Sequence, residues 1–262
     1  MTETPEQRRS RATGWCRRMA GFAVVLLAVV WVGHHYGLVE SQGYLWVLAL
    51  VPVFAALALV FGAFGFSRIW TYGDLGGRDL TAGLLMALLV LAPYGVAASL
   101  MILDPPLRDV STDLDTPPAL PTATSRTARM NDLIPQSPGE QRLQVENYPL
   151  VTGRRYQSSM DETIAAVEAV LAKQGWQLAA SPDPQDIAAG EVTIGALARS
   201  FVLDLPVDVA VRITADEDST LVDMRSASRY GRHDLGDNAR RIAAFLAALD
   251  AEVAGQAGAA AQ

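Results

Sequence analysis

Three long apolar runs dominate the first hundred residues, and short polar segments separate them. The runs cover residues 19–36, 44–66 and 80–101, and the second and third contain no charged residue. Each run is long enough to cross a hydrocarbon core about 30 Å thick as a helix. The pattern therefore predicts a basic tail over residues 1–18 and a region of three transmembrane helices over residues 19–101.

The first run follows a basic stretch, as the apolar core of a secretory signal peptide does. No small-x-small cleavage site follows this run, and two further apolar runs come after it. We therefore interpret it as an uncleaved first span.

Arginines are distributed unequally between the two sides of the predicted spans. The loop 37–43 between the first two spans contains no arginine, and its single charged residue is Glu40. The arginines of the other side precede the first span or follow the second: Arg8, Arg9, Arg11, Arg17, Arg18, Arg68 and Arg78. Cytoplasmic loops carry an excess of Lys and Arg. We expect a multi-pass protein of the inner (plasma) membrane with a cytoplasmic N-terminus, and a periplasmic or otherwise extracytoplasmic segment after Met101.

Prolines interrupt residues 102–147, so no continuous helix is expected there. We predict that this segment is an extended arm. Residues 148–254 follow as a folded domain, and residues 255–262 as a flexible tail with small side chains.

Helical and strand periodicities alternate within residues 148–254. Ser159 and Glu162 have capping-box spacing and begin a helix, and Asp234 is the expected N-cap of a last helix. The apolar positions of that last helix follow helical spacing: Leu235, Ala239, Ile242, Leu246, Leu249 and Val253. Strands are predicted near 175–180, 191–203, 207–215 and 220–227. The order predicts an α+β domain in which an antiparallel sheet of about four strands is flanked by two helices.

The strands 207–215 and 220–227 predict a hairpin with residues 216–219 as its loop. Only a register that places Arg212 opposite Asp223 brings the apolar residues of both strands to the same side. Val211 and Met224 then pair on the buried face. The outward face carries the remaining polar residues, and we expect it to be solvated: Asp208, Arg212, Asp223 and Arg225.

Charge divides the chain as sharply as hydropathy does. Residues 1–101 contain five acidic and seven basic residues, and residues 102–262 contain 23 acidic and 14 basic residues. An acidic domain lacks the basic footprint that nucleic acids require, so we expect no nucleic-acid partner. The single cysteine, Cys16, precedes the first apolar run, so the domain contains neither a disulfide nor a thiol nucleophile.

Two stretches carry a resemblance to a known family. These are the segment DVSTDLDTPP at residues 109–118 and the segment DMRSASRYGRHDLGDNARRI at residues 223–242. The chain resembles domain-of-unknown-function family 1499 of bacteria and plastids, over roughly residues 109–250. The family often has two acidic residues before its third strand, whereas here Val207 occupies the first position and only Asp208 remains. The resemblance implies a single domain in an envelope setting, and it implies no activity.

A polar cluster precedes the last helix, where free helix amides favour negative charge. Its arginines and serines suit an anionic ligand or partner: Arg225, Ser226, Ser228, Arg229 and Arg232. Asp208, Arg212 and Asp223 would contribute from the sheet. The alternative is that these arginines pair with acidic neighbours such as Asp208 and order the loop.

Two further sets of polar residues contain side chains of the kinds that catalyse reactions or bind metals. His233 with Asp234 and Ser226 or Ser228 resembles a triad in composition, but no nucleophile-elbow pattern surrounds either serine. The carboxylates at residues 109, 113 and 115 lack EF-hand spacing, and Asx-turns explain them as well. We predict no metal, no cofactor and no catalytic residue.

Three functions fit this pattern. The first is a non-catalytic envelope module that binds a partner protein, a lipid headgroup or a small anion. The second is an envelope hydrolase that uses Asp208 or Asp223 with His233, which would require a pocket that encloses them. The third is an accessory subunit of a membrane complex that acts through its spans. The lipid bilayer is a partner in every case, and we favour the non-catalytic module.

Overall fold

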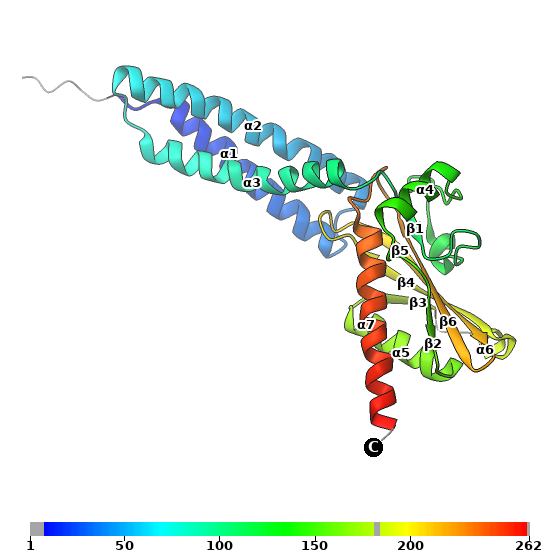
Figure 1. Ribbon diagram of the computed structural model, residues 1–262. Coiled ribbons are helices and arrows are strands. Elements are labelled where there is room, and N and C mark those ends of the chain that lie inside the picture. The colour runs from blue at the N-terminus through cyan, green and yellow to red at the C-terminus, as the bar shows by residue number, and fades with distance from the viewer. Residues whose placement is uncertain (1–7, 181–183, 261–262) are drawn as a thin grey trace, which may run out of the picture. The chain divides into compact units, whose positions relative to one another are not determined.

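The protein is described by a computed structural model that covers residues 8–180 and 184–260. The chain divides into two compact units, residues 1–99 and residues 100–262. Figure 1 shows the helices of the first unit and the sheet of the second.

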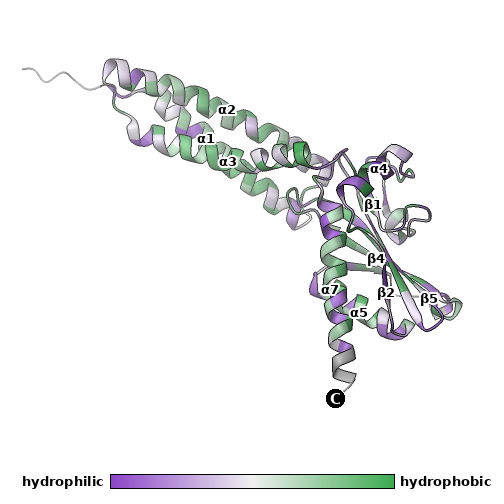
Figure 2. Cartoon of the chain, in the orientation of Figure 1, coloured by the Kyte–Doolittle hydropathy of each residue, from purple (hydrophilic) through white to green (hydrophobic). Residues whose placement is uncertain are grey.

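Three helices, long and apolar enough to cross a membrane, account for the first unit. They are α1 (Arg11–His35), α2 (Ser41–Tyr72) and α3 (Gly77–Leu103). Figure 2 shows that apolar residues predominate along all three. Pro52 lies inside α2 and Pro93 inside α3, as a membrane helix tolerates. The prediction of three such helices is confirmed, and all three extend beyond the apolar runs.

Small residues allow these helices to approach closely. A methyl group added at Gly83 of α3 would lie 2.5 Å from the Cys16 sulfur, and one added at Gly65 of α2 would lie 2.7 Å from the Thr13 side chain. Ala20, Ala58 and Ala87 form a buried cluster in the same unit. Membrane helices associate through such small-residue contacts because lipid supplies no hydrophobic force between them.

The second unit contains a six-stranded sheet in the order β1-β6-β5-β4-β3, and β2 also pairs with β6. The strands are β1 (Asp109–Ser111), β2 (Arg154–Tyr156), β3 (Gln177–Ala180), β4 (Glu191–Arg199), β5 (Pro206–Asp216) and β6 (Ser219–Ser228). All pairings are antiparallel. The expected sheet of about four strands is thus corrected to six, because β1 and β2 each have three residues and show no periodicity.

The hairpin of β5 and β6 has the predicted register. Arg212 pairs with Asp223, and Val211 pairs with Met224. The turn is tighter than expected, because Asp216 and Ser219 already pair across it. Helices α5 (Met160–Lys173) and α7 (Asp237–Ala260) cover the apolar face of the sheet (Figure 1).

Both flanking helices have defined starts. The Ser159–Glu162 capping box of α5 is present as predicted. Helix α7 begins at Asp237, two residues later than an N-cap at Asp234 implies, because Leu235 and Gly236 adopt φ angles of 59° and 70°. The Asp234 carboxylate caps this turn by accepting bonds from the amides of Gly236 and Asn238 at 2.9 and 3.0 Å. The helix then continues to Ala260, past the expected domain end at residue 254.

The predicted arm, residues 102–147, is instead part of the folded unit. It contributes β1, the 3-10 helix η1 (Pro121–Ser125) and α4 (Pro138–Asn147). Residues 112–136, hereafter the covering segment, pack on the sheet face opposite α5 and α7. Leu120 lies against Ala210 and Ala227 there. The remaining short helix is α6 (Pro184–Ala189).

Candidate functional site

The polar face of the central strands is buried beneath the covering segment. Asp208 has no solvent exposure, and Asp223 is 5% exposed. The expectation of a solvated face is therefore wrong. Strand alternation correctly separated this face from the apolar one, but alternation says nothing of what lies on top of it.

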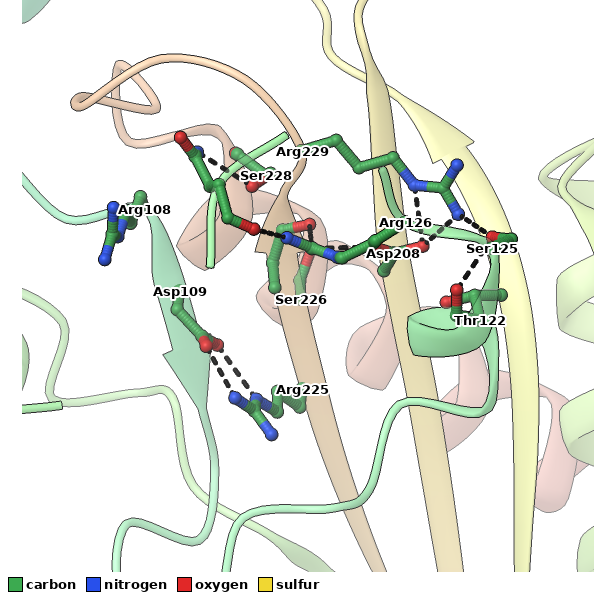
Figure 3. A network of polar contacts seen from close by, with 12 residues as sticks. Arg108, Asp109, Thr122, Ser125, Arg126, Asp208, Arg225, Ser226, Ser228 and Arg229 are labelled. Atoms are coloured by element: carbon green, nitrogen blue, oxygen red, sulfur yellow. Dashed lines mark hydrogen bonds and ion pairs between the residues drawn. The ribbon is translucent and has the colours of Figure 1, made fainter. Parts of the chain in front are cut away.

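Asp208 on β5 lies between two guanidinium groups (Figure 3). Arg126 of the covering segment donates to Oδ2 at 2.7 Å, and Arg229 donates to Oδ1 at 2.9 and 2.6 Å. Arg229 also donates to the Ser125 hydroxyl at 2.8 Å, and Arg126 to the Asn131 carbonyl at 2.6 Å. The predicted pairing of Arg229 with Asp208 exists, and its role is to hold the covering segment on the sheet. Sequence reasoning missed Arg126, which lies in a stretch interpreted as an arm.

A second group of ion pairs fastens the start of the covering segment. Arg212 donates to Asp113 at 2.7 Å and to its hairpin partner Asp223 at 3.2 Å. Asp223 also accepts a 2.7 Å bond from the Thr112 hydroxyl. Figure 3 shows a third pair, in which Arg225 donates to both carboxylate oxygens of Asp109, at 3.0 and 2.7 Å. These predicted site residues therefore bind one another.

The predicted convergence of serines and arginines does not occur. Ser226 and Ser228 lie on the other face of β6, towards α7. There the Ser226 hydroxyl donates to the Asn238 side chain at 2.8 Å, and the Ser228 hydroxyl accepts from it at 3.1 Å. Successive residues of a strand point to opposite faces, so Arg225 and Ser226 cannot share a site. Arg232 is exposed in the turn before α7.

His233 forms no triad. Its Nδ1 accepts a 2.9 Å bond from the Leu235 amide, so Nε2 carries the proton and donates to the Asp104 carbonyl at 3.1 Å. Asp234 serves as the cap described above, and its burial raises its pKa. Within residues 8–180 and 184–260, no hydrogen bond joins His233 to Asp208, to Asp223 or to either serine.

The acidic residues at the entry motif hold the chain. Asp109 binds Arg225, whereas Asp113 accepts bonds from the amides of Asp115 and Thr116 at 3.0 and 2.9 Å, which is the Asx-turn alternative. Burial raises the pKa of Asp113, but bonds from Thr116, Arg212 and Asp115 outweigh it and lower the pKa to about 2. No cluster of three metal-binding side chains occurs in the part of the chain that the structure describes.

A cavity of about 350 Å³ lies at the start of α7, outside the ion-pair network. The loop between β4 and β5 forms its apolar wall, with Val202, Leu203 and Leu205 among the lining residues. His233 and Arg240 lie at its polar edge. One sequence feature indicates this cavity, namely the apolar run Phe201–Leu203. Its periodicity alone places it at the end of the strand predicted near 191–203.

Three helices that are long and apolar enough to cross a membrane, joined to an α+β domain with a covered six-stranded sheet, define the class of protein. The family model described as "Protein of unknown function (DUF1499)" matches residues 109–249. The chain belongs to this family, and the match runs from β1 into α7. No curated protein and no solved structure matches the chain.

Proposed function

We propose that the C-terminal unit is a non-catalytic binding module of the cell envelope, which three membrane helices hold outside the plasma membrane. The arginine asymmetry around the helices supports this orientation. The ion pairs on the polar sheet face support a structural role for Asp208 and Asp223, because each carboxylate is already neutralised by arginine. Neither carboxylate is available as a hydrolase base.

The cavity at the start of α7 carries the proposal. Its volume suits a small molecule or a short acyl group. Its walls are mainly aliphatic, and the charges at its edge are paired, since Arg240 binds Asp104 at 3.2 Å and Arg241 binds Asp237. Because the charges at this edge are neutralised, we expect it to hold a ligand through hydrogen bonds and not through net charge. The ligand we infer therefore has an apolar body and an uncharged polar head at this edge.

Asp104 connects the edge of this cavity to the end of α3 along the chain. Asp104, which binds both His233 and Arg240, directly follows the last residue of α3. Phe201, beside the cavity, is 92% exposed. An exposed aromatic ring beside a mainly aliphatic cavity supports a ligand with an apolar body.

Val202→Trp tests the proposal by filling the cavity, and Val145→Trp is the matched control on the exposed surface of α4. Full-length protein of each type is purified from native membrane, and co-purifying small molecules are identified by mass spectrometry. We expect one species to be lost only with Val202→Trp. An identical set of molecules in the wild type and in both variants would overturn the proposal.

A further inference from the structure

A second cavity, of about 250 Å³, lies in the membrane unit where α1 begins. The residues that line it come from the start of α1 and from the end of α2: Arg8, Arg9, Ser10, Arg11, Ala12, Arg68 and Asp74. It is independent of the C-terminal cavity and of the function proposed for that domain.

Backbone bonds hold the wall of this cavity in place. The Ser10 amide donates to the Leu75 carbonyl at 2.9 Å, and the Leu75 amide donates to the Arg8 carbonyl at 2.9 Å. The Thr13 hydroxyl donates to the Ser10 carbonyl at 2.8 Å. The start of α1 is thus fixed against the loop that connects α2 to α3.

Ser10 occupies the N-cap position of α1, yet its side chain caps no helix amide. The residue is 7% exposed, and its hydroxyl has no hydrogen-bond partner among the residues that the structure describes. A buried hydroxyl without a partner costs free energy. Ser10 is among the residues that line the cavity, so a shift of its side chain would bring this hydroxyl to a ligand that accepts a hydrogen bond and would remove the cost.

The charge around the cavity is strongly positive. Asp74 is neutralised by Arg68, whose Nε donates to it at 3.0 Å. Arg8, Arg9 and Arg11 are exposed and form no ion pair within residues 8–180 and 184–260. The first-turn amides of a helix add a partial positive charge. Together these groups match a phosphate, which accepts several hydrogen bonds.

Aromatic side chains indicate the depth of the cavity in the membrane. Trp70 and Tyr72 lie exposed in the last turn of α2, and Arg68 lies over the Tyr72 ring at 4.9 Å. Trp15 is exposed on the second turn of α1. Trp and Tyr concentrate at the level of lipid headgroups.

We propose that this cavity binds the phosphate of an anionic phospholipid in the leaflet that faces the N-terminus. The Ser10 hydroxyl and the first amides of α1 donate to the phosphate, and Arg8 and Arg11 neutralise it. Free phosphate has the same chemistry, but headgroup depth favours the lipid.

The test uses the full chain in mild detergent, titrated with phosphatidylglycerol, phosphatidylcholine or inorganic phosphate, with bound ligand counted by native mass spectrometry. The Arg8→Gln/Arg11→Gln variant should weaken phosphatidylglycerol binding by roughly 30-fold, because each basic residue near an anionic surface contributes roughly 5-fold. The matched control, Arg18→Gln/Arg78→Gln, removes the same charge outside the cavity and should leave binding within about 2-fold. Ser10→Ala should weaken binding without lowering the melting temperature.

Equal losses in the two double variants would overturn the site, because they would indicate a diffuse surface charge. Unchanged binding in Ser10→Ala would overturn the assigned donor role. Inorganic phosphate that binds as tightly as phosphatidylglycerol would overturn the assignment to a lipid.

Discussion

The carboxylate of Asp208 lies beneath the guanidinium groups of Arg126 and Arg229, with no exposure to solvent. Burial of a charge is costly, and the partners offset that cost only while all of them are present. The three side chains come from β5, from the covering segment and from the turn before α7. The Arg126–Asp208 pair therefore joins parts of the chain that are 82 residues apart.

Asp208→Asn should destabilise the C-terminal unit by about 3 kcal/mol or more, because it leaves two buried arginines without a counter-charge. Asp115→Asn, at an exposed position, should change stability by less than about 0.5 kcal/mol. Urea titration with pulse proteolysis of the full chain measures both. Equal midpoints for Asp208→Asn and the wild type would show that the network contributes nothing to folding.

Asp113 predicts a pH dependence of stability. Its pKa in the folded chain, about 2, lies below the unfolded value of about 3.9. Its contribution is thus complete above about pH 4 and is lost as the pH falls towards 2, and amounts to about 2 kcal/mol.

The stability advantage of the wild type over Asp113→Asn should accordingly shrink as the pH falls through this window. Asp115→Asn, which changes a neighbouring carboxylate at an exposed position, is the control for this comparison. Parallel curves for the wild type and Asp113→Asn would contradict the bonds that Thr116, Arg212 and Asp115 donate to this carboxylate.

The hairpin register was predictable from individual residues, because a one-residue slip would expose Val209, Val211 and Ile213. The burial of Asp208 was not predictable. It depends on contacts from Ser125 and Arg126, and the prolines around them indicated only that no continuous helix forms. Prolines exclude a helix but not close packing on a sheet.

At the scale of elements, the covering segment packs closely on the sheet at Gly195, where the strand carries no side chain. Gly195 of β4 lies under Pro121 of η1, and a methyl group added at Gly195 would lie 2.9 Å from the proline ring. A larger residue there must lift η1 from the sheet, since neither the strand nor the ring can yield easily.

Gly195→Val should therefore destabilise the unit by about 1–3 kcal/mol and raise amide hydrogen exchange in the covering segment. Exchange in α7, on the opposite face, should change less. Gly139→Ala, in the first turn of α4, would place a methyl group in ordinary contact with the Ser137 hydroxyl at 3.9 Å and serves as the control. Uniformly faster exchange in both regions would contradict a segment that is attached locally.

Long elements were predictable and short ones were not. Helix α5 carries both a capping box and an apolar stripe, so its sequence defines its start and its buried face. Strands β1 and β2 are held by pairing with β6, which supplies all their ladder bonds. The start of α7 shifted because Leu235 adopts a left-handed conformation that is uncommon for its residue type.

At the scale of the whole molecule, hydropathy and charge divide the chain at nearly the same place as its contacts do. The apolar unit ends at residue 99, and the acidic domain follows. An apolar run needs no tertiary partner to be recognised, which is why the three long apolar helices could be predicted from the sequence. The cavity at the start of α7 could not be predicted from the sequence. It forms only where the loop between β4 and β5 meets the residues around the start of α7.

The central claim is that the three helices place the C-terminal unit outside the cytoplasm. Single cysteines at Val145 and at Arg78, each in a Cys16→Ala background, test it with a membrane-impermeant maleimide on spheroplasts. Both positions are exposed. We predict that Val145→Cys is labelled in intact spheroplasts and that Arg78→Cys is labelled only after lysis. Labelling of Arg78→Cys alone in intact spheroplasts would contradict the account.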